Sequence, residues 1–237
     1  MKRLIYIDTS EFVAANFAFA GQRLTTVVSR VKAGQVAIGL PSITKQEIIS
    51  QIDKALHEAD QAIAKARSGA RVLRNLDDDF SISLFRDFDR AAHRETLSAQ
   101  LDEFLSDSEA IILDFDGVDP AAIFEMYFSK KAPFGDSKKK SEFPDAFTLA
   151  MLSEWADSEQ QDVFIASSDG DFQAGASGFH RLEHVGTLEQ LLARIALEFD
   201  QLAPAAETAL RALEGEIEDG LCERFQELVV RHVNYAT

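Results

Sequence analysis

Three short and mainly apolar runs constrain the fold of this chain more than any other feature. They lie at residues 3–7, 36–40 and 163–166, and none of them alternates apolar with polar side chains. An apolar run of four to eight residues without alternation is typical of a strand buried on both faces of a parallel sheet. Longer segments with helical periodicity separate the runs. This order predicts an α/β fold of three layers, with a central parallel sheet flanked by helices.

The expected helices and the remaining strands divide the chain into a main domain and an appendage. Helices are predicted over about 11–31, 44–73, 84–105, 120–127, 145–156 and 187–199, and further short strands over about 110–113 and 181–185. Residues 1–200 are expected to form one domain that contains a helical insertion over about 50–110. Residues 201–237 are expected to form a helical C-terminal appendage.

The chain has one cysteine, Cys222, and this limits the classes of protein to be considered. A single cysteine excludes a disulfide framework and a zinc site built from cysteines. There is neither an apolar stretch of membrane-spanning length nor a signal-peptide core near the start. We therefore expect a soluble cytoplasmic protein without a membrane partner.

The formal net charge of −16 opposes binding to a polyanion. Carboxylates clustered around metal ions would account for part of that charge. The basic residues are concentrated in one short segment, which contains Lys130, Lys131, Lys138, Lys139 and Lys140. A local basic surface can guide a phosphate backbone on an otherwise acidic protein, so these lysines are candidate nucleic-acid-binding residues. The alternative is a solvated surface loop.

Acidic residues follow the predicted strands and begin two of the predicted helices. Asp8 follows the first strand, and Asp169 and Asp171 follow the strand at 163–166. Glu47 and Asp145 lie in the first turns of helices. Ligands of open parallel sheets bind beyond the carboxyl ends of the strands. Oxygen ligands without His or Cys favour Mg²⁺ or Mn²⁺, at oxygen–metal distances of about 2.0–2.6 Å.

Each of these acids also has a purely structural interpretation. Glu47 is spaced to form a capping box with Thr44, and Asp145 can complement the dipole of its helix. Asp169 and Asp171 lie in a Ser-Ser-Asp-Gly-Asp segment that is typical of a turn. Asp8 can begin a helix. Their joint placement at one edge of the sheet is what indicates a site.

Four segments of the chain resemble the motifs of the PIN-domain superfamily. They are the strand ending in Asp8-Thr9-Ser10, the segment from Leu40-Pro41 to Glu47, the helix start Phe143-Pro144-Asp145-Ala146, and the loop from Ser167 to Asp171-Phe172. The resemblance covers roughly residues 3–195. The run at 132–145 is similar to a bacterial PIN-like branch that is known as a domain of unknown function.

The resemblance implies a metal-dependent endoribonuclease that acts on RNA, with single strands favoured and DNA left open. It implies Asp8, Glu47, Asp145 and Asp169 as catalytic metal ligands, with Asp171 as a further ligand and Glu142, Ser10 and Ser167 as auxiliary residues. A homodimer and an inhibitory or regulatory protein partner are also left open.

Two other functions are compatible with the sequence. Residues 110–118 match the first motif of haloacid-dehalogenase-like phosphatases, in which Asp114 would be the nucleophile and Asp116 the acid. That motif should lie on the first strand of its domain, whereas here two strands precede it. The third hypothesis is a non-catalytic PIN-like module that binds RNA or a protein.

Overall fold

The computed structural model describes residues 3–135, 140–199, 213 and 217. The chain divides into two compact units, 1–192 and 193–237. In the second unit the described residues are helical, and Arg194 pairs with Glu198 at 3.3 Å. Within the described ranges, no helix is both long enough and apolar enough to cross a membrane.

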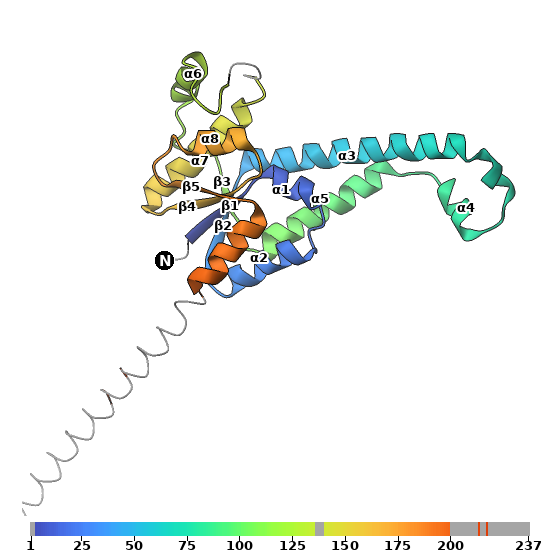
Figure 1. The fold of residues 1–237 in the computed structure, drawn as a ribbon, viewed down its shortest axis with the longest axis horizontal. Helices are drawn as coiled ribbons and strands as arrows, with labels where there is room; N and C mark the ends of the chain where they lie inside the picture. The colour runs from blue at the N-terminus through green and yellow to red at the C-terminus, as the bar shows by residue number, and fades with distance from the viewer. Residues whose placement is uncertain (1–2, 136–139, 200–212, 214–216, 218–237) are drawn as a thin grey trace, which may run out of the picture. The chain divides into compact units, whose positions relative to one another are not determined.

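The first unit contains a five-stranded sheet in which all neighbouring strands are parallel (Figure 1). The strands are β1 (Arg3–Ile7), β2 (Val36–Pro41), β3 (Ile111–Leu113), β4 (Val163–Ala166) and β5 (Leu182–Gly186). Their order is β3-β2-β1-β4-β5, so β1 lies in the centre between β2 and β4. The predicted α/β class and its central parallel sheet are confirmed.

Helices cover both faces of the sheet (Figure 1). They are α1 (Thr9–Ala14), α2 (Gln22–Lys32), α3 (Ser42–Gly69), α4 (Asp79–Leu84), α5 (Arg90–Asp107), α6 (Pro120–Phe128), α7 (Phe143–Glu159) and α8 (Gly170–Ala176). Leu4 and Tyr6 of β1 pack in one cluster with Leu149 and Leu152 of α7 and with Phe172 of α8. Ile5 lies between them on β1, and its side chain points to the other face, because side chains alternate along a strand.

The single helix predicted over 11–31 is wrong. Asn16 and Phe17 have positive φ angles of 49° and 56°, which end the first helical segment, and Gly21 is the N-cap of α2. The sequence between α1 and α2 contains no proline and only this one glycine, so composition gave no signal of the break.

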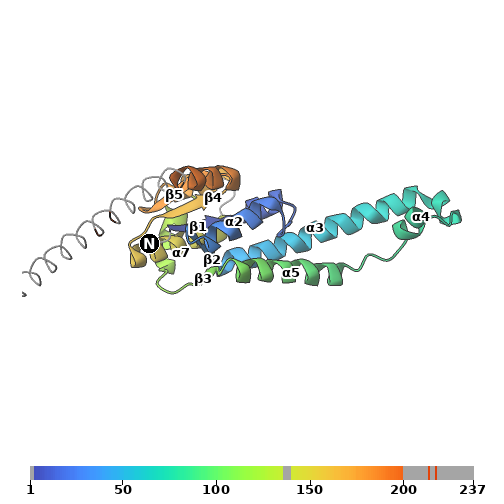
Figure 2. The same ribbon diagram turned by 90° about the horizontal axis from the view of Figure 1, so that it is seen from below.

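Helices α3 and α5 run side by side and continue beyond the sheet to the segment that contains α4 (Figures 1 and 2). Salt bridges join Lys45 to Asp102 at 2.8 Å and Asp53 to Arg94 at 2.8 Å. The start of α3 and the end of α5 bury apolar side chains, such as Ile52 and Leu101. These residues lie within the segment of about 50–110 that was predicted as a helical insertion.

Candidate active site

Four of the predicted acids line one pocket of about 260 Å³ at the carboxyl edge of the sheet. The lining residues are Asp8, Thr9, Glu47, Ser50, Gln51, Asp145, Asp169 and Phe172. They come from the ends of β1 and β4, from the start of α1, from the second and third turns of α3, and from the first turns of α7 and α8. The central position of β1 brings these elements together, since its neighbours on both sides end at the same edge.

Hydrogen bonds hold both carboxylate oxygens of Asp8. Its Oδ2 accepts from the Ser10 hydroxyl at 2.5 Å and from the Ser167 hydroxyl at 2.9 Å. Its Oδ1 accepts from the Tyr6 hydroxyl at 3.3 Å. Burial and the neighbouring Asp8 charge raise the pKa of Tyr6 well above its usual value, so this phenol stays protonated and remains a donor. Asp8 is therefore fixed in orientation with only 7% of its surface exposed.

Glu47 does not form the predicted capping box. Helix α3 begins at Ser42 after Pro41, so Thr44 lies within the first turn, and its hydroxyl is hydrogen-bonded to Tyr6 at 3.1 Å. The Glu47 carboxylate accepts instead from the Thr9 hydroxyl at 3.4 Å. Burial and the charge of Asp8 raise the pKa of Glu47. The capping interpretation is wrong, and the Glu47 side chain lies in the pocket.

Asp145 has the most perturbed carboxyl group of the pocket. It lies in the first turn of α7 with Pro144 beside it. The pKa of Asp145 is raised from 3.8 to about 8, mainly by burial and then by the charges of Glu47 and Asp8. Glu142 raises it further through its charge and a hydrogen bond. A shift of this size shows that the pocket concentrates negative charge in a poorly solvated space.

The loop after β4 supplies Asp169, which is exposed and lines the pocket. The backbone N–H of Asp169 donates to the Ser167 hydroxyl at 3.1 Å, while that hydroxyl donates to Asp8. His184 of β5 is hydrogen-bonded to the Ser167 carbonyl at 2.8 Å. Ser167 therefore couples the loop to Asp8. Asp171 belongs to α8, but its side chain lies outside the described residues.

The pocket provides suitable donors for a hard cation but no assembled ligand set. Over the described residues, no three His, Cys, Asp or Glu side chains converge closely enough to hold a metal ion. The donors that line the pocket are carboxylates, hydroxyls and an amide, which is the chemistry that Mg²⁺ and Mn²⁺ prefer. A cation would also relieve the mutual repulsion that raises the pKa values of Glu47 and Asp145. The residues present therefore fit a divalent metal.

Several residues of the pocket were not singled out from the sequence. Ser50 and Gln51 follow Glu47 by three and four positions, which places all three on one side of a helix. That spacing was the available signal. Phe172 closes the apolar side of the pocket and stacks on Tyr6, with ring centroids 5.7 Å apart.

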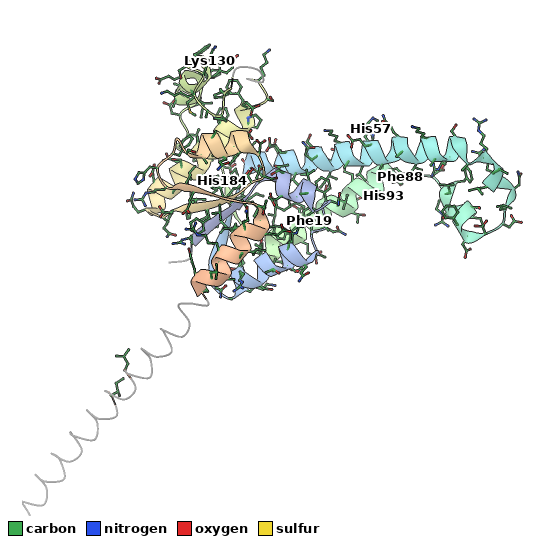
Figure 3. The ribbon with its side chains drawn as sticks, in the orientation of Figure 1. Phe19, His57, Phe88, His93, Lys130 and His184 are labelled. Carbon is green, nitrogen blue, oxygen red and sulfur yellow. The ribbon has the colours of Figure 1, made fainter. Side chains whose placement is uncertain are left out.

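Other predicted residues lie away from the pocket lining. Asp114 and Asp116 are exposed after the edge strand β3, which does not fit the central first strand of a phosphatase. Lys130, Lys131 and Lys140 are exposed and do not line the pocket. Lys138 and Lys139 lie outside the described residues. Lys130 lies just beyond α6 (Figure 3).

The parallel sheet flanked by helices, with an acidic pocket at its carboxyl edge, defines the class of the protein as a three-layer α/β fold. A family model described as PIN domain matches residues 5–172, which is more than half of the chain, and this chain belongs to the PIN-domain family. PIN domains are generally nucleases and typically use divalent metals. No curated protein and no solved structure matched the chain.

Proposed function

We propose that this protein is a metal-dependent endoribonuclease that hydrolyses RNA phosphodiester bonds at the carboxylate pocket. The observation that supports it most is the convergence of Asp8, Glu47, Asp145 and Asp169 on one pocket of a PIN domain. The perturbed pKa of Asp145 adds to it, because like charges crowded into a cleft are characteristic of functional sites rather than of stabilising ones. The single cysteine fits a reducing cytoplasmic compartment.

In this proposal the four carboxylates hold Mg²⁺ or Mn²⁺, and Asp171 is available as a further ligand. When bound, such ions activate a water molecule and stabilise the leaving oxygen of a phosphodiester. Ser10, Ser167 and Tyr6 orient Asp8 through the hydrogen bonds described above. Glu142 is hydrogen-bonded to Asp145 and can orient it toward the pocket.

The overall reaction consumes one water molecule for each bond cut. The water oxygen forms a bond to phosphorus, and the bond between phosphorus and the 3′ oxygen breaks. The 3′ oxygen takes up a proton, so the products carry 5′-phosphate and 3′-hydroxyl ends. Single-stranded RNA is the favoured substrate, and the lysines at 130–140 are proposed to hold its backbone against the acidic surroundings.

The central test is cleavage of labelled RNA and of DNA of the same sequence by the full chain. We expect cleavage of RNA in Mn²⁺ or Mg²⁺ and none after addition of EDTA. Activity that survives EDTA would contradict the metal dependence. Hydrolysis of a small phosphomonoester that requires Asp114 rather than Asp8 would instead support the phosphatase hypothesis.

Ser167 gives a more specific prediction because its hydroxyl both accepts from Asp169 N–H and donates to Asp8. Ser167→Ala should lower cleavage about 10- to 100-fold, which is the usual cost of removing a group that orients a metal ligand. In the same variant, the Mn²⁺ concentration that gives half-maximal activity should rise. Ser167→Thr keeps the hydroxyl and should restore most of the activity. A loss of thermal stability without any change in Mn²⁺ dependence would assign Ser167 to the fold alone.

A further inference from the structure

Seven aromatic residues gather around α6 and the start of α7, beside the carboxylate pocket. They are Phe115, Phe124, Tyr127, Phe128, Phe134, Phe143 and Phe147. The centre of the cluster is Phe134, which is fully buried against Tyr127 and Phe143. The cluster is thus a small core of its own.

Two rings on α6 are not covered by this core. Phe124 is 49% exposed and Phe128 is 76% exposed. Exposure of one large apolar side chain is ordinary, but these two rings stack on each other, with centroids 6.4 Å apart and planes 27° apart. Phe124 in turn contacts Phe143, with centroids 5.6 Å apart. The result is a ladder of three rings that leads from solvent into the protein.

The inner end of the ladder lies at the pocket. Phe143 is the first residue of α7, directly after Glu142 and two positions before Asp145. Glu142 is hydrogen-bonded to Asp145, which lines the pocket. The inner ring of the ladder is therefore joined through the start of α7 to a carboxylate of the pocket.

The same segment has the opposite charge to the rest of the chain. Residues 124–141 contain five lysines and two acids, whereas the whole chain has a net charge of −16. Lys130 and Lys131 follow Phe128 after one serine, and both are exposed. Figure 3 shows Lys130 just beyond α6. Exposed aromatic rings flanked by cations match a ligand that is anionic along its backbone and aromatic along its side groups.

We propose that Phe124 and Phe128 form a stacking platform for unpaired bases of a single-stranded nucleic acid, whose phosphates are held by the adjacent lysines. The inference rests on the proposed nuclease function and deepens it by assigning the substrate class and the side from which the strand enters. Bases stack on exposed aromatic side chains irrespective of sequence. Bases within a duplex are already stacked on one another, so the platform selects single strands.

A protein partner fits this surface less well. The large exposed apolar residues of α6 are the two phenylalanines, and two cations rather than further large apolar side chains follow them. The segment around α4 offers a useful contrast, since it exposes the aliphatic side chains of Val72, Leu76 and Ile82 together with Phe80. Phe80 is 66% exposed and is therefore a matched control for the α6 rings.

The test is equilibrium binding of a labelled RNA strand of about 12 nucleotides without internal pairing, measured by fluorescence anisotropy on the full chain in EDTA. Because each stacked base contributes a factor of roughly 5 to 100 in affinity, Phe124→Ala and Phe128→Ala should each weaken binding by about that factor. Phe80→Ala should leave binding unchanged. The same RNA annealed into a duplex should bind weakly and should not respond to either α6 variant. The two α6 variants should weaken binding of a DNA strand by a similar factor, because each DNA base also has a stacking face.

Phe128→Leu separates base stacking from general apolar contact, because leucine keeps the apolar side chain and lacks the aromatic face. It should bind RNA as weakly as Phe128→Ala. The platform would be overturned if Phe128→Leu bound RNA with wild-type affinity. Wild-type affinity in the double variant that carries both Phe124→Ala and Phe128→Ala would overturn it too. A change in self-association without a change in RNA affinity, seen by size-exclusion chromatography, would overturn it in favour of a protein interface. Binding that depends on the rings in a chain that never cleaves RNA would refute the nuclease function alone, whereas cleavage with unchanged binding would refute the platform alone.

Discussion

Asp8→Asn should reduce metal-dependent RNA cleavage by about 10²- to 10³-fold, since a positioned metal is worth several kcal/mol in the transition state. Asp8 follows the central strand, and hydrogen bonds hold both of its carboxylate oxygens. Asparagine has the same size and can keep the hydrogen bonds from Ser10 and Ser167 to its oxygen. The fold should therefore persist while the charge that attracts the metal is lost. Single-turnover cleavage with saturating Mn²⁺ gives the measurement.

Asp114→Asn is the matched control, because Asp114 also follows a strand of the same sheet but is exposed and outside the pocket. Its cleavage rate should stay within a factor of about two of wild type, as for an ordinary surface change. Equal rates for wild type and Asp8→Asn would refute the proposed site. Loss of activity in the Asp114 variant with normal activity in the Asp8 variant would move the chemistry to the end of β3.

The sheet could be predicted from the sequence because its three inner strands, β1, β2 and β4, are buried on both faces and therefore appear as continuous apolar runs. The break between α1 and α2 could not, since it depends on positive φ angles at Asn16 and Phe17. Phe17 is buried, so packing compensates for a backbone conformation that its residue type disfavours. Local propensity does not contain that information.

The pocket acids could be predicted because the carboxyl ends of parallel strands meet at one edge. The sequence alone could not decide between a site role and a helix-capping role for these acids, because that choice depends on the residue at which each helix begins. The Thr44–Glu47 spacing suits a capping box, but α3 begins two residues earlier and Thr44 binds Tyr6 instead. The same spacing at Thr187 and Gln190 does form a reciprocal box, with bonds of 2.8 and 3.4 Å. One pattern thus has two outcomes, decided by tertiary contacts.

The aromatic ladder illustrates a different limit. Phe124 and Phe143 are nineteen positions apart in the sequence, and their contact depends on how α6 packs on α7. A sequence rich in phenylalanine predicts a buried core, and Phe134 meets that expectation. The exposure of Phe124 and Phe128 depends on which face of α6 the core covers.

Asp145→Asn should increase the stability of the metal-free protein at alkaline pH. The pKa of Asp145 is raised from 3.8 to about 8 by burial and by neighbouring carboxylates. Between these two pH values the folded state binds more protons than the unfolded state, so the free energy of unfolding of the wild type falls as the pH rises through this window. Asparagine removes that dependence. One pKa unit corresponds to about 1.4 kcal/mol, and screening of the partly exposed group reduces the expected gain at pH 8.5 to about 1–3 kcal/mol.

The sign of this effect distinguishes the two interpretations of Asp145, because an acid in the first turn of a helix normally stabilises it by about 0.3–1 kcal/mol. Asp79 occupies the same kind of position in α4, is exposed and lies outside the pocket, so Asp79→Asn should lower stability slightly. Urea unfolding in EDTA at pH 4 and pH 8.5 gives the comparison. The free energy of unfolding of Asp145→Asn should match that of wild type at pH 4 and exceed it at pH 8.5.

Excess Mn²⁺ should reverse the order of the two stabilities, since a ligand at 100 times its Kd adds about 2.7 kcal/mol to a protein that retains its site. If Asp145→Asn instead behaves like Asp79→Asn at both pH values and in Mn²⁺, then the Asp145 carboxylate serves the helix dipole and the pocket does not concentrate charge for a metal.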